Sequence, residues 1–147
     1  MLEINADLWS VPADAVVITT NGTIKKNGEA VMGRGCAKEA AQLYPDLPRL
    51  LGNRISECGN YVHLFSMDDR NLVSMPVKHG WREPASLTLI RQSLEELVEL
   101  TNNVRWQRVV MPRPGCGNGG LSWFTVKLLI GDKLDDRFIV VDYVRPS

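Results

Sequence analysis

Along this chain, apolar residues occur either in short continuous runs or at helical spacing, and the two patterns alternate. The run Ala15–Thr19 (AVVIT) is mostly β-branched and has no polar alternation, which is typical of a strand covered on both faces. The polar segment Asp68–Asn71 lies between two further apolar runs and predicts a turn that joins two strands. Including those two, short strands are predicted at Leu2–Ile4, Val62–Phe65, Leu72–Met75, Val109–Met111 and Phe138–Val144.

Three segments between these runs have the features of helices. Cys36–Leu43 is rich in alanine and ends near Pro45. Ser86 is a plausible N-cap for a helix that extends to about Leu100, and Ser122 for a last helix to Ile130. The middle helix has one apolar face, made by Leu87, Ile90, Leu94, Leu97 and Val98. Alternating strands and helices predict a three-layer α/β/α domain with a mostly parallel mixed sheet.

Composition limits the choice of partners. The chain has 147 residues, which suits a single domain over 1–147. Its 17 basic and 17 acidic residues balance, so no extended nucleic-acid surface is expected, because such surfaces need clustered positive charge. Basic residues cluster locally at two places. Lys25 and Lys26 form one group, and Lys78, His79 and Arg82 form the other.

The sequence also predicts where the protein works and what it lacks. Three cysteines are an odd number without CxxC spacing, and with only two histidines they form no recognisable zinc pattern. A reducing, cytoplasmic location is therefore expected, without disulfides, metal or cofactor. No apolar window is long enough to cross a membrane, so no membrane partner is expected.

Two glycine-rich loops stand where strands lead into helices. Gly33-Arg34-Gly35 precedes the first helix, and the run Gly115–Gly120 (GCGNGG) lies between the strand Val109–Met111 and the last helix. Such loops expose backbone N–H groups at a helix N-terminus, which is an anion site usually taken by phosphate. In parallel sheets both loops open at the carboxyl ends of strands. The pair therefore predicts a cleft that holds a diphosphate.

These residues resemble the macrodomain family over nearly the whole chain. Asp7 in NADLW, then Asp14 in a strand that ends at Asn21, match the family's opening pattern. Val31–Ala37 (VMGRGCA) and Pro112–Trp123 (PRPGCGNGGLSW) correspond to its two glycine loops. The second loop is most similar to a subgroup that contains terminal ADP-ribose protein glycohydrolase and the DNA ADP-ribosyl glycohydrolase antitoxins.

The resemblance implies a ligand and the residues that bind it. The ligand is ADP-ribose, free or attached to a protein or nucleic acid. Asp7 would accept a hydrogen bond from the adenine amino group, and Asn21 would lie near the distal ribose. Arg34, which replaces a glycine of the usual triple-glycine loop, would contact the substrate or point to solvent. The implied ligand-binding residues are Asp7, Asn21, Gly33, Arg34, Gly35, Gly115, Cys116, Gly117, Asn118 and Gly119.

The resemblance also implies a reaction. In the subgroup a strand ends in Pro-x-Lys with a catalytic lysine, and here that segment is Pro76-Val77-Lys78. An amine near the anomeric carbon could attack it or stabilise a leaving group. Lys78, with Asn21 beside the distal ribose, is therefore the catalytic candidate. Three functions remain open: an ADP-ribosyl hydrolase, an ADP-ribose 1″-phosphate phosphatase, and a reader that binds ADP-ribose without turnover.

Overall fold

The computed structural model describes residues 1–142 of the chain. Six strands form one sheet in the order β1-β6-β5-β2-β4-β3, and all neighbours are parallel except the antiparallel pair β3–β4. The strands are β1 (Leu2–Ile4), β2 (Ala15–Asn21), β3 (His63–Ser66), β4 (Asn71–Lys78), β5 (Val109–Pro112) and β6 (Phe138–Val141). The helices are α1 (Gly35–Leu43), α2 (Leu47–Cys58), α3 (Leu87–Val104) and α4 (Trp123–Ile130).

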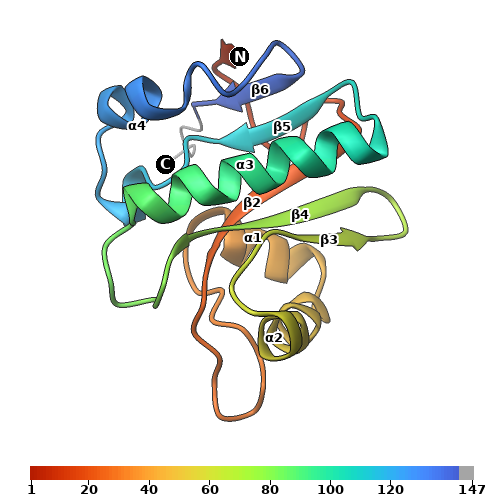
Figure 1. Cartoon of the computed structure of the whole chain (residues 1–147). Coiled ribbons are helices and arrows are strands. Elements are labelled where there is room, and N and C mark those ends of the chain that lie inside the picture. Colours follow the sequence, from red (N-terminus) through yellow and green to blue (C-terminus); the bar gives the residue numbers. More distant parts are fainter. Residues whose placement is uncertain (143–147) are drawn as a thin grey trace.

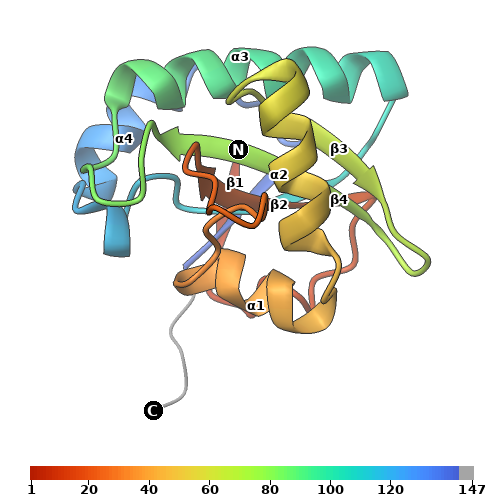
Figure 2. The ribbon, with the colours of Figure 1, turned by 90° about the horizontal axis from the view of Figure 1, so that it is seen from below.

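The helices cover the sheet from both sides (Figures 1 and 2). Alternate residues of β2 divide between the two layers, as a strand buried on both faces requires. Val17 packs in the core under α3 and α4, whereas Val16 and Ile18 pack in the core under α1 and α2. The predicted three-layer α/β/α fold with a mostly parallel mixed sheet is confirmed.

Ser86 and Ser122, the two predicted N-caps, both stand at the start of a helix. Ser86 does cap α3, because its Oγ accepts a hydrogen bond from the Leu89 backbone N–H at 3.2 Å. Ser122 occupies the N-cap position of α4, but its side chain makes no capping hydrogen bond. Leu87, expected on the buried face of α3, is 36% exposed because it stands at the first position of the helix, where Leu89 faces the core instead.

Other departures concern the lengths and the number of elements. Helix α2 was not expected from the sequence, although Leu47, Leu51 and Ile55 share one buried face at four-residue spacing. Strand β4 continues beyond Met75 to Lys78, which places the lysine within the strand rather than after it. Strand β6 ends at Val141, and the expected continuation to Val144 reaches outside the described residues.

The parallel pairing of β2 with β4 brings the predicted catalytic residues together. Asn21 is the register partner of Lys78, after a bulge between Thr20 and Asn21. Both residues end their strands, so both stand at the carboxyl edge of the sheet. In the described part of the chain, no helix is long and apolar enough to span a membrane.

Candidate functional site

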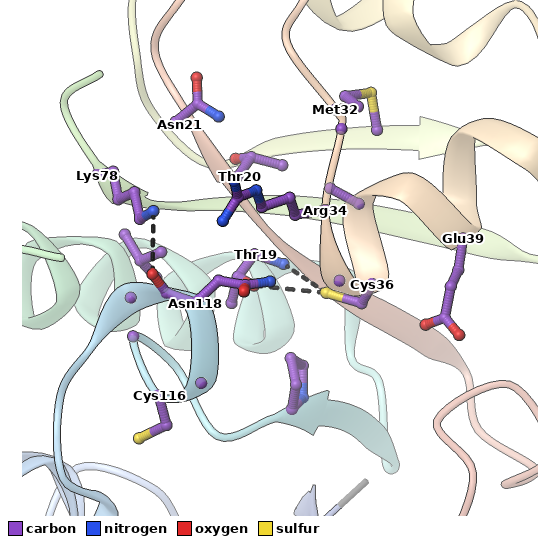
Figure 3. Close-up of a pocket in the computed structure, with 18 of the residues that line it drawn as sticks. Thr19, Thr20, Asn21, Met32, Arg34, Cys36, Glu39, Lys78, Cys116 and Asn118 are labelled. Carbon is purple, nitrogen blue, oxygen red and sulfur yellow. Dashed lines mark hydrogen bonds between the residues drawn. The ribbon is translucent and has the colours of Figure 1, made fainter. Parts of the chain in front are cut away.

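A cavity of about 760 Å³ opens at the carboxyl ends of the parallel strands. The ends of β2, β4, β5 and β6 form its floor, and both glycine loops line it (Figure 3). This is where open parallel sheets bind their ligands, and the volume is that of a small-molecule site. Nearly all residues predicted as ligand-binding or catalytic line the cavity: Asn21, Gly33, Arg34, Gly35, Lys78, Gly115, Cys116, Gly117, Asn118 and Gly119.

One end of the cavity holds Asn21 and Lys78. The Lys78 Nζ donates to the backbone carbonyl of Asn118 at 3.3 Å, so the amine is held between β4 and the second glycine loop (Figure 3). The Asn21 side chain organises the loop that follows β2. Its Nδ2 donates to the Val31 carbonyl at 3.1 Å, and its Oδ1 accepts from the Thr23 backbone N–H at 2.9 Å.

The first glycine loop leads directly into α1. Arg34 is the N-cap residue with an extended backbone and makes no side-chain cap, so the first N–H groups of the helix face the cavity without a capping side chain. Gly33 and Gly35 are both exposed. The Arg34 side chain is exposed as well and lies over the cavity (Figure 3).

The second glycine loop is built against α3. A short 3₁₀ turn, Gly117–Gly119, follows Cys116, and the Gly119 carbonyl accepts from the Ala85 backbone N–H at 3.1 Å. The Asn118 side chain extends toward the first loop, since its Nδ2 lies 3.4 Å from the place of a Cβ on Gly35. The two loops therefore approach one another across the cavity.

Two cysteines line the cavity, and neither has the surroundings of a nucleophile. Cys36 lies under the first loop, where its Sγ contacts the Thr19 N and Oγ1 at 3.4 Å each. Burial raises the pKa of the Cys36 thiol, and it also raises that of Cys116. Both sulfurs therefore stay protonated at neutral pH, and a thiol is a much weaker nucleophile than a thiolate.

At the end of the cavity away from Lys78, the lining residues differ from those expected to bind adenine. Asp7 does not line the cavity; its carboxylate is exposed and accepts from the Trp9 backbone N–H at 3.1 Å. The next residue, Leu8, does line it, together with two acidic residues that sequence reasoning missed, Glu39 and Asp142. Glu39 lies on the side opposite Lys78 in Figure 3.

Asp142 is joined to the second loop through Arg113, which the sequence reasoning also missed. The Asp142 carboxylate pairs with the Arg113 guanidinium at 3.5 Å. That guanidinium in turn lies 5.2 Å from the centre of the Trp123 ring. Asp142 reaches the cavity through the position of β6 in the sheet.

The fold is that of the macrodomains. The structure superposes on the macrodomain of Mycobacterium tuberculosis DarG with a TM-score of 0.81 at 24% identity, covering 99% of this chain and 97% of that one. It also superposes on Thermosipho africanus DarTG, solved in complex with ADP-ribose, with a TM-score of 0.82 at 19% identity, covering 97% of this chain and 41% of that one.

Within that class, the sequence is similar to the DNA ADP-ribosyl glycohydrolases. It is 26% identical to the Thermus aquaticus protein of that name over 139 residues, which are 90% of this chain and 37% of that protein. The chain thus spans about a third of the length of the curated relatives it matches. No family model matches the chain. The resemblance to macrodomains, and to this subgroup in particular, is confirmed.

Proposed function

We propose that this chain binds ADP-ribose in the cavity and hydrolyses the bond that joins ADP-ribose to a DNA base. The observation that carries the proposal is the position of Lys78, whose amine is fixed at one end of a cavity lined by two glycine loops. The similarity to proteins named DNA ADP-ribosyl glycohydrolase supports DNA as the carrier of the modification.

The lining residues suggest how ADP-ribose lies. The diphosphate would sit between the loops, against backbone N–H groups of the first turn of α1 and of Gly117–Gly119, with Arg34 adding a positive charge. The distal ribose would reach Asn21 and Lys78. The adenine would then occupy the far end beside Leu8, and its amino group would donate to the carboxylate of the neighbouring Asp7.

The chemistry at the distal ribose requires cleavage of the bond between its anomeric carbon and a base nitrogen. A neutral Lys78 amine can attack that carbon, so that the base leaves with the bonding electrons and takes up a proton. The resulting glycosylamine opens its ring, the ring oxygen takes up a proton, and the Schiff base so formed is hydrolysed by water to ADP-ribose and the free amine. A protonated Lys78 would instead stabilise the leaving base while water attacks. In both cases the sum of the reaction is addition of one water.

Replacement of Lys78 separates an enzyme from a reader. Lys78→Ala should lower the turnover of ADP-ribosylated DNA at least about 100-fold, the usual size of an acid–base or nucleophilic contribution. Binding of free ADP-ribose, measured by calorimetry, should stay within several-fold of wild type. Lys38→Ala, an exposed lysine of α1 outside the cavity lining, is the matched control and should be fully active.

Two further measurements define the role and the substrate. Borohydride should trap a covalent product in wild type but not in Lys78→Ala if the amine attacks, and Lys78→Arg should not rescue, since a guanidinium stays protonated. Turnover should be compared on thymidine-, glutamate- and serine-linked ADP-ribose and on ADP-ribose 1″-phosphate. Wild-type rates for Lys78→Ala on thymidine-linked ADP-ribose would contradict the proposal, and turnover of the 1″-phosphate alone would identify a phosphatase.

A further inference from the structure

Two loops that are distant in sequence lie side by side beyond the Lys78 end of the cavity. The Gly22 backbone N–H donates to the His79 carbonyl at 3.2 Å, and the Trp81 backbone N–H donates to the Thr23 Oγ1 at 3.0 Å. A Cβ on Gly22 would come within 2.6 Å of the His79 carbonyl oxygen, so the close approach of the loops depends on glycine. The loops at 22–31 and 79–84 therefore form one continuous surface next to the proposed reaction centre.

Each of the two loops carries exposed cations from one basic group of the sequence. Lys25, Lys26 and Arg82 are exposed, and we call them, together with Trp81, the basic rim. Within residues 1–142 none of the ion pairs involves a residue of the rim. The chain as a whole has no net charge, but the loops beside Lys78 carry an excess of cations.

The acidic residues of the same loops do not cancel this charge. Glu29 accepts from the Asn27 side-chain amide at 3.0 Å and is partly buried. Glu83 is the remaining carboxylate of the two loops, next to Arg82 in sequence and without an ion pair in the described residues. The three exposed cations of the rim and the half-buried Lys78 therefore outnumber the two carboxylates of these loops.

Trp81 adds an aromatic platform to the rim. Its side chain lines the cavity and is nevertheless 44% exposed. The Arg82 guanidinium lies 4.8 Å from the centre of the Trp81 ring, a cation–π contact that places positive charge beside an exposed aromatic face. Aromatic rings flanked by basic side chains are the means by which proteins hold single-stranded nucleic acid, through base stacking and phosphate contacts.

We propose that the basic rim binds the single-stranded DNA that flanks the modified base. Trp81 stacks on a neighbouring base, and Lys25, Lys26 and Arg82 contact backbone phosphates. This inference rests on the proposed function, which places the modified base at Lys78. Single-stranded rather than duplex DNA is inferred because a base inside a duplex must leave the stack before its attachment atom can reach an enclosed site.

Binding of an unmodified, fluorescently labelled single-stranded oligonucleotide at low salt tests the rim without any hydrolysis. The double variant Lys26→Ala/Arg82→Ala should weaken binding about tenfold and reduce the slope of log K against log salt by about 1.4, because each phosphate that is no longer neutralised lowers the slope by about 0.7. Free ADP-ribose should bind as in wild type, because neither side chain lines the cavity. Arg108→Ala, an exposed arginine before the amino end of β5, is the control and should change neither affinity.

The aromatic platform has its own test with the same oligonucleotide. Trp81→Ala should weaken binding about tenfold with little change in the salt slope, and Trp81→Phe should restore most of it, since stacking needs a ring rather than a charge. Absence of oligonucleotide binding by wild type, or an equal weakening in Arg108→Ala, would overturn the proposal.

A protein-recognising rim would give a different result that also overturns the proposal. The rim variants would then impair turnover of a glutamate-linked ADP-ribosyl peptide and leave oligonucleotide affinity unchanged. The proposed hydrolysis fails separately: wild type that binds the oligonucleotide but releases no ADP-ribose from a modified one contradicts the hydrolysis and not the rim.

Discussion

The two glycine loops of the cavity lie across from one another but are held in different ways. In the second loop Gly115 has a φ of 76°, and a Cβ there would lie 2.6 Å from the Ile90 side chain of α3. In the first loop Gly33 has an ordinary φ, and nothing lies within 4 Å of where its Cβ would be. The second loop is therefore packed against the core at Gly115, whereas the first loop borders open space at Gly33.

This difference separates two reasons for glycine at a binding site. At Gly115 the fold itself requires a residue without Cβ, because both the backbone conformation and the neighbouring side chains exclude one. Gly119 belongs partly to this group, since its Cβ would meet the Ala85 Cβ at 2.9 Å. At Gly33 the folded protein imposes no such requirement. A need for glycine at that position would arise only from a ligand that approaches the backbone.

The largest effect is expected at the packed glycine. Gly115→Ala should lower the free energy of unfolding by about 3 kcal/mol, the sum of a strained positive φ and an overpacked contact with Ile90. Gly117→Ala is the control, because its φ of 72° is equally strained while nothing lies within 4 Å. It should lose only about 1 kcal/mol. Urea unfolding measures both, and equal losses would mean that packing against α3 contributes nothing.

A smaller effect, on affinity alone, is expected at the open glycine. Gly33→Val should leave the melting temperature unchanged, because no protein atom lies within 4 Å of the added Cβ and φ is ordinary. It should weaken ADP-ribose binding about tenfold, as an added side chain keeps the diphosphate from the backbone. Gly33→Ala should fall between wild type and valine. Wild-type calorimetric affinity in the valine variant would show that the ligand does not approach the first loop.

The smallest expected effect is a difference in the rate at which the thiols of the two loops are alkylated. Iodoacetamide at pH 8 should modify the exposed Cys58 first and Cys36 last, with Cys116 between them. Burial raises the pKa of Cys36 and Cys116, which lowers the reactive thiolate fraction at this pH, so their rates should keep rising as the pH passes the ordinary thiol range. Saturating ADP-ribose should slow Cys36 and Cys116 and not Cys58, as mass spectrometry of the peptides would show. Equal protection of Cys58 would indicate a global change instead.

The sequence by itself determined the elements whose signals are local. The β-branched run Ala15–Thr19, the N-cap at Ser86 and the two glycine loops each depend on neighbouring residues, and each appears in the structure. Helix α2 shows the limit of this reasoning. Pro48 in its first turn looks like a break in sequence, yet proline is tolerated there because the first N–H groups of a helix need no partner within it.

Only the tertiary structure decided which of these elements meet. Asn21 and Lys78 face each other because β2 and β4 are neighbours in register, and Asp142 reaches the cavity because β6 lies beside β5. Trp81 stands next to the loop after β2 through one hydrogen bond to Thr23. Strand order follows from how the helices bury both faces of the sheet, which is a property of the whole chain. No local pattern carries that information, so Glu39, Arg113 and Asp142 were placed at the cavity by the fold, whereas the resemblance had already indicated Asn21 and Lys78.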